Sequence, residues 1–170
     1  MAEAPGTFAG DDFADFFENA AVPLRCIGPD GTILHANRAE LELLGYAREE
    51  YVGRHIGEFH VDAVALHDLL ARLARGETLR DQPARLRRRD GSVRHVLIDS
   101  NARREGGRFL YTRCLTRDVT ARAAADQRQA AEHAITRRLA EAVTVVEAAD
   151  DVLGTLLATF GWRRAALWLA

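Results

Sequence analysis

Lysine is absent from this chain of 170 residues, which also has only two cysteines, one methionine and four prolines. All 23 basic residues are therefore arginine, and with 25 acidic residues they leave a formal net charge of −2. A chain so close to neutrality gives no electrostatic reason to expect nucleic acid or an anionic membrane as a partner. Hydrophobic residues make up 48% and charged residues 28%, as in soluble globular proteins that bury a core.

Long apolar runs are also missing. No stretch approaches the length needed to span a bilayer, and the opening MAEAPGTFAGDDF lacks the basic start and apolar run of a secretory signal. We therefore expect a cytoplasmic protein. Cys26 and Cys114 stand alone, without C-x-x-C and without a histidine at metal-ligand spacing. They are interpreted as small buried thiols in a reducing compartment, and no metal site is expected.

Catalytic signatures are not found either. The sequence has no Gly-rich phosphate loop, H-E-x-x-H, G-x-S-x-G or kinase signature. His133, in A-E-H-A-I-T-R-R, lacks the acidic and Arg-Pro elements that follow the phosphoacceptor histidine of a histidine kinase. It is interpreted as a solvated position on a helix, and the chain itself is expected to be non-catalytic.

The stretch 28–53 is where the sequence is most informative. Asp30-Gly31 after a proline is typical of a tight turn, because Asp bonds locally and Gly accepts a positive φ. A strand follows the turn. Asn37 then suits the N-cap of a helix that Gly45 would end.

Periodicity indicates the other elements. A short helix at 11–20 carries Phe13, Phe16 and Phe17 on one face, and a helix at 61–75 has Val64, His67, Leu70 and Leu73 or Ala74 at helical spacing. The expected strands are 24–27, 32–36, 78–88, a fourth containing 95–99, and 108–117. Apolar residues on both faces of the last strands predict a sheet buried on both sides.

These pieces together resemble a PAS domain, the sensory module of bacterial signalling proteins. The order D-G-x-I-x-x-x-N-x-A, then L-L-G-Y-x-x-E-E-x-x-G, is similar to the opening of that family, and R-R-R-D-G-S and T-R-D-V-T-A-R to its later parts. The resemblance covers roughly residues 20–122. It implies an α+β fold with a five-stranded antiparallel sheet, flanking helices and a long C-terminal helix. The expected layout is a tail and cap helix at 1–20, the PAS domain at 21–120, a signalling helix at 121–148 and a further segment at 149–170.

After residue 120 small and apolar residues recur at spacings of three and four from Ala121 to Phe160, with Arg128 as the exception. This heptad seam favours a parallel two-stranded coiled coil over a lone helix packed back on its own domain. Asp150 and Asp151 interrupt the seam and suggest that a new helix begins there. The segment DDVLGTLLATFGWRRAALWLA resembles the first helix and strand of a GAF domain, with 165–170 as the start of a truncated strand.

The resemblance also implies a cavity between the sheet and its helices. Our expected strand parity gives it a polar lining of His95, Asp99, Thr112 and Thr116 among apolar side chains that include Leu97, with Cys114 beside them. Such a lining is compatible with a small-molecule ligand and equally with a collapsed, empty core. Some PAS domains bind haem through a histidine on the long helix, where His67 is the candidate; a polar residue on a helix surface is the favoured reading of it. Flavin-binding light sensors need N-C-R-F-L-Q in that helix, and here it has no cysteine.

The D-V-T sequence supplies the functional hypothesis. In the family, Asp118 and Thr120 join the last strand to the output helix, and Arg122 is a plausible ion-pair partner of Asp118. We expect a sensory and dimerisation module of a multidomain signalling protein, with a histidine kinase as its parent. It would form a homodimer through the N-terminal helix, the sheet face and the C-terminal coiled coil. The alternatives are a haem- or flavin-binding redox or gas sensor and a ligand-free dimerisation adaptor.

Overall fold

A computed structural model describes residues 10–141, 145–160 and 162–166. The expected N-terminal tail and most of the expected strand at 165–170 lie outside these residues. The chain divides into two compact units, Met1–Val119 and Thr120–Ala170.

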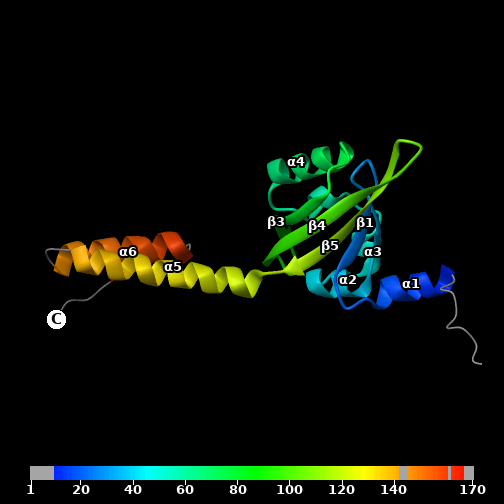
Figure 1. Cartoon of the computed structure of the whole chain (residues 1–170). Helices are drawn as coiled ribbons and strands as arrows, with labels where there is room; N and C mark the ends of the chain where they lie inside the picture. The colour runs from blue at the N-terminus through cyan, green and yellow to red at the C-terminus, as the bar shows by residue number, and fades with distance from the viewer. Residues whose placement is uncertain (1–9, 142–144, 161, 167–170) are drawn as a thin grey trace, which may run out of the picture. The chain divides into compact units, whose positions relative to one another are not determined.

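The first unit is built on one sheet of five antiparallel strands (Figure 1). The strands are β1 (Leu24–Ile27), β2 (Ile33–Ala36), β3 (Leu79–Arg87), β4 (Val93–Glu105) and β5 (Arg108–Asp118). Their spatial order is β2-β1-β5-β4-β3, so the last strand lies in the centre beside the first. The expected fold class is confirmed.

Helices gather around this sheet (Figure 1). They are α1 (Gly10–Asn19), α2 (Arg38–Leu44), α3 (Arg48–Tyr51), the 3-10 turn η1 (Ile56–Glu58) and α4 (Ala63–Ala74). Buried residues of α2, α3 and η1 share one core cluster with the inward-facing residues of all five strands. The cluster includes Ile27, Ile33, Leu44, Ile56, Leu86, Val96, Ile98 and Cys114.

The turn before β2 forms as the sequence predicts. The carboxylate of Asp30 accepts hydrogen bonds from the Thr32 amide at 3.0 Å and from its hydroxyl at 2.9 Å. Gly31 has φ +84, and a Cβ at this position would lie 2.3 Å from Nε2 of His55. Only glycine fits there, because both the backbone conformation and the close approach exclude a side chain.

Asn37 holds the start of α2 against the start of the sheet. Its Oδ1 accepts the Glu40 amide at 3.0 Å, as predicted for an N-cap, and also the Leu24 amide at 2.9 Å. Its Nδ2 donates to the carbonyls of Val22 at 2.8 Å and Ala20 at 3.3 Å. One fully buried amide therefore ties the first helix of the core to the chain entering β1.

The inner face of α4 differs from the expected one. Leu66, Leu69 and Leu73 are buried, whereas His67 is exposed and Val64 is 87% exposed. The set Val64, His67, Leu70 and Leu73 or Ala74 is therefore not the inner face of α4, and His67 lies at the surface, as in the favoured interpretation of it. The leucines form their own i, i+3, i+7 set, and burying them turns the Val64–His67 face to solvent.

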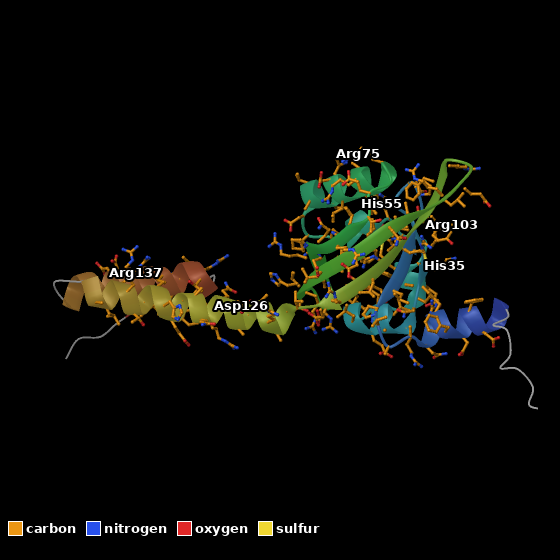
Figure 2. The ribbon with its side chains drawn as sticks, viewed as in Figure 1. His35, His55, Arg75, Arg103, Asp126 and Arg137 are labelled. Atoms are coloured by element: carbon orange, nitrogen blue, oxygen red, sulfur yellow. The ribbon has the colours of Figure 1, made fainter. Side chains whose placement is uncertain are left out.

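The second unit is a helical hairpin. Helix α5 (Thr120–Glu141) and helix α6 (Val145–Phe160) run antiparallel, with Arg138 3.2 Å from Asp151 and Gln127 donating to the carbonyl of Thr159. Charged side chains such as Asp126 and Arg137 stand off α5 (Figure 2).

The signalling helix expected over 121–148 is therefore shorter than predicted, since α5 ends at Glu141. The seam position Ala142 lies outside the described residues. The new helix begins at Val145, five residues before the expected Asp150. Asp150 and Asp151 are exposed on α6, so they neither break nor cap the helix.

We expect Asn37→Asp to lower the free energy of unfolding by about 3 kcal/mol. The carboxylate keeps the N-cap acceptor but loses both donors and faces two carbonyl oxygens. Urea denaturation measures the effect, with Asn19→Asp as the control because Asn19 is exposed at the end of α1. Equal stability of the two variants would contradict the assigned role.

Candidate functional site

Four polar side chains meet inside the sheet-and-helix layer. Arg25 of β1 forms an ion pair through Nη1 with Oε1 of Glu40 on α2, and donates to the Thr116 hydroxyl of β5 at 3.0 Å. The Tyr51 hydroxyl of α3 donates to the same Glu40 oxygen at 3.0 Å. None of the four is more than 2% exposed. We call Arg25, Glu40, Tyr51 and Thr116 the inner polar cluster.

Burial strengthens the electrostatic interactions between the members of this cluster. Burial and the adjoining Glu40 carboxylate raise the pKa of Tyr51 well above its usual value, so its hydroxyl stays protonated. Burial opposes the charge on Arg25, but the Glu40 carboxylate outweighs it and the pKa of Arg25 is raised. Within the described residues, Nε of Arg25 and Oε2 of Glu40 have no hydrogen-bond partner. Removing either ion would leave the other buried without its counter-charge.

His60 borders the cluster as a neutral side chain. It is 8% exposed, and burial, together with the positive charge of Arg25, lowers its pKa to about 3. A proton on this imidazole would lie in a dry interior beside an arginine. The protonation of His60 therefore depends on whether water is excluded from this part of the core.

The sheet register separates the predicted site residues. Thr112, Cys114 and Thr116 face inward as expected and are buried. Cys114 contacts two hydroxyls, that of Ser100 at 3.0 Å and that of Thr112 at 3.2 Å.

His95, Leu97 and Asp99 lie on the opposite face of the sheet. Ile98 pairs with Thr116 and Ser100 with Cys114, so the inward side chains of β4 are the even-numbered ones. The expectation of one shared lining is therefore wrong for β4. A shift of parity by one residue moves every side chain of a strand to the other face, and apolar residues on both faces of β4 hid the difference.

Sequence reasoning missed Arg25, Glu40 and Tyr51 as a cluster. Arginine and glutamate are rarely buried, so each by itself is expected at the surface. The available signal was Arg25 in the middle of L-R-C-I, a short strand that is otherwise apolar, and Glu40 three residues after the N-cap.

At the end of the sheet, the predicted junction residues are held by β4. The Asp118 carboxylate lies 3.6 Å from Arg94, and the Val119 amide donates to the His95 carbonyl at 2.9 Å. Helix α5 starts at Thr120. In the second unit, Arg122 lies 3.9 Å from the Asp126 carboxylate.

Within the described residues, no three His, Cys, Asp or Glu side chains come close enough together to hold a metal ion. None of the described helices combines the length and the apolar character needed to cross a membrane.

The sequence profile of the PAS fold matches residues 17–124, the segment that holds the sheet and its helices. The chain belongs to the PAS family. No protein with a curated description matches this PAS chain.

Solved structures share the fold. The PAS domain of an HTR-like protein from Haloarcula marismortui is 27% identical, with a TM-score of 0.56 over 64% of this chain and 89% of that one. A domain of a sensory box sensor histidine kinase/response regulator from Geobacter sulfurreducens is 24% identical, with a TM-score of 0.55 over 64% and 92%. An RNA-binding Light-Oxygen-Voltage receptor is 23% identical, with a TM-score of 0.62 over 74% of this chain and 39% of that one. The chain thus shares the PAS fold with these neighbours.

His60 gives a pH prediction. Its folded pKa of about 3 lies below the ordinary 6.5, so the unfolded chain binds the proton first and stability falls as the pH drops from 6.5 toward 3. We expect His60 to contribute a slope of up to about 1.4 kcal/mol per pH unit between pH 6 and 5. Urea denaturation should show this slope reduced in His60→Gln and retained in His67→Gln, whose histidine is exposed. Equal slopes in the native protein and His60→Gln would contradict the closed interior.

Proposed function

We propose that this PAS chain is the sensory and dimerisation module of a multidomain bacterial signal-transduction protein, with a histidine kinase as the parent. The observation that carries the proposal is the continuity of β5. Thr116 belongs to the inner polar cluster, and two residues later Asp118 is held by Arg94 before α5 begins. A change in the cluster would therefore reach the end of β5 within one strand, and through it the helix that leads to the output.

The transmitted change is a shift between two arrangements of the core. Such a shift needs only about 1–3 kcal/mol of coupling between core and output to alter activity several-fold. Thr120 at the start of α5 and Arg122 in its first turn remain the proposed transmission residues. On this proposal 149–170 is the start of a GAF domain, and the whole protein is cytoplasmic.

A ligand-free dimerisation adaptor is the second candidate. The buried side chains of the inner polar cluster occupy the layer between sheet and helices, which favours a core that senses through pairing over one that encloses a ligand. The haem alternative has less support, because His67 is exposed on α4 and His95 on the outer face of β4.

Pairing is proposed to involve α1. Phe13 and Phe16 are 60% and 65% exposed, and two such aromatic rings on one short helix are typical of a surface that a partner covers. An ion pair of 2.6 Å between Glu18 of α1 and Arg48 of α3 links this helix to the rest of the first unit. A second copy of the chain, bringing the same two phenylalanines, is the proposed partner, with the sheet face and the C-terminal helices contributing to the same homodimer.

Replacing both rings tests the pairing. We expect Phe13→Ser combined with Phe16→Ser to weaken self-association at least about tenfold, because the apolar area of two rings no longer drives it. Sedimentation velocity over a concentration series measures the dissociation constant, and Val64→Ser, at a still more exposed apolar position on α4, is the control. An unchanged constant in the double variant would rule out pairing through α1.

A further inference from the structure

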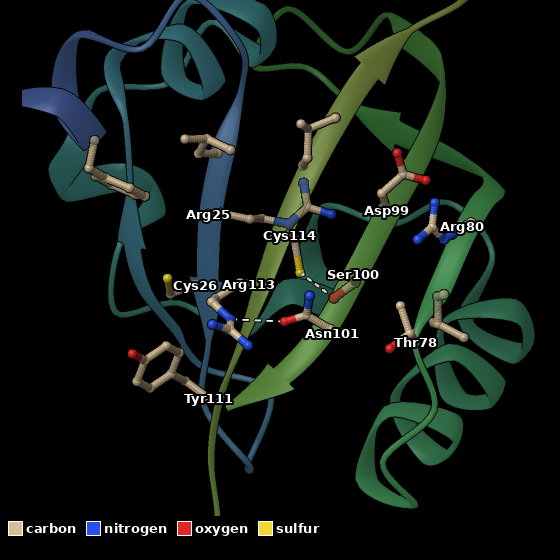
Figure 3. A pocket seen from close by; sticks show the side chains of 14 residues that line it. Arg25, Cys26, Thr78, Arg80, Asp99, Ser100, Asn101, Tyr111, Arg113 and Cys114 are labelled. Atoms are coloured by element: carbon tan, nitrogen blue, oxygen red, sulfur yellow. Dashed lines mark hydrogen bonds between the residues drawn. The ribbon is translucent and has the colours of Figure 1, made fainter. Parts of the chain in front are cut away.

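A groove of about 500 Å³ lies mainly along the outer face of the sheet, and its lining also includes Arg25, Ser100 and Cys114 from the strands beneath it. Its lining comes from β1, β5, β4 and the start of β3 (Figure 3), and Phe17 of α1 also belongs to it. The volume is in the range of sites that hold small organic molecules. The lining combines apolar and charged side chains.

The apolar part comes from the two central strands. Leu24 and Cys26 of β1 pair with Leu115 and Arg113 of β5, so these side chains share the outer face, and Tyr111 continues the row. Burial raises the pKa of Cys26, which keeps its thiol neutral. These side chains can pack against an apolar ligand body, and Arg113 is the one charged residue among them.

The polar part is shaped by an irregularity in β3. The register with β4 shifts between Leu79 and Gln82, and Asp81 has φ +50. The Asp81 amide donates to Asp99 at 2.6 Å, and Arg80 beside it becomes part of the groove wall.

The charges of the groove favour an anion. Asp99 is already compensated by the Asp81 amide and by Arg117 at 3.3 Å. Arg113 donates through Nε to Asn101 at 2.8 Å, a neutral partner that leaves its charge uncompensated. Within the part of the chain that the structure describes, the Arg80 guanidinium has no hydrogen bond or ion pair.

We propose that this groove binds a small amphipathic organic anion, a carboxylate or sulfonate on an apolar body. The anionic group lies between Arg80 and Arg113, and the body lies over Leu24, Cys26 and Leu115. Arginine suits this role because its planar guanidinium matches the geometry of an oxyanion. The site goes beyond the proposed sensory role. Because the proposed homodimer also uses the sheet face, probe binding is measured at protein concentrations below the dissociation constant of self-association, where the groove is not covered by a second copy.

Two fluorescent probes of nearly the same shape test the proposal. 1-Anilinonaphthalene-8-sulfonate carries the anion, and N-phenyl-1-naphthylamine is the same ring system without it. We expect Arg80→Gln to weaken binding of the sulfonate about fivefold and to leave the amine unaffected, since only the ion pair is lost. Arg108→Gln is the matched control, because Arg108 is exposed at the start of β5 and does not line the groove.

Other outcomes overturn the proposal. If Arg80→Gln leaves the sulfonate affinity unchanged, or if Arg108→Gln lowers it equally, the groove is not an anion site. Each titration is repeated in the Phe13→Ser, Phe16→Ser variant, whose replaced rings lie outside the groove lining. Probe binding in this variant tests the groove, and its self-association tests the pairing. If self-association weakens while probe binding is unchanged, the two proposals can fail independently.

Discussion

The buried ion pair between Arg25 and Glu40 is the contact on which this PAS core depends. Taking two charges out of water costs several kcal/mol for each ion, and only close pairing with further hydrogen bonds offsets that cost. Tyr51 and Thr116 supply those bonds, so β1, α2, α3 and β5 are held to one another by a single cluster. Apolar packing could bring the same elements together but would not fix their positions so narrowly.

The ion pair is connected through Thr116 to the end of β5, where the first unit ends. Thr116 lies in the cluster through its hydroxyl, while its amide donates to the Pro23 carbonyl at 3.0 Å, next to the start of β1. Three residues later the Val119 amide bonds to β4. Any movement of Arg25 or Glu40 therefore acts on the last residues of β5, where the first unit ends and α5 begins.

The parts of the fold that local chemistry decides were predictable. The turn at Asp30-Gly31, the N-cap Asn37 and the five strands follow from residues whose preferences are strong at short range. The inward face of α4 and the parity of β4 did not follow, because both have apolar residues on two faces and only tertiary packing selects between them. The end of α5 at Glu141 was not predicted for a similar reason, since the heptad spacing of the sequence continues from α5 into α6.

The candidate site was less predictable than the fold. Thr112, Cys114 and Thr116 were placed correctly from the alternation in β5, but the charged residues at the centre of the core were missed. A buried arginine is recognisable only when its carboxylate partner is seen beside it, and Glu40 lies 15 residues further along the chain. The outer groove likewise depends on a bulge in β3 that the sequence does not reveal.

Hydrogen exchange at the backbone amides of Thr116 and Val119 is the most direct test of the link between the cluster and the end of β5. In Glu40→Gln, which removes the buried charge, the account predicts faster exchange at both amides. Glu42→Gln, at an exposed position on the same helix, should leave them as in the native protein. If Glu40→Gln accelerates exchange in α2 alone and leaves Thr116 and Val119 unchanged, the inner polar cluster does not control the end of β5.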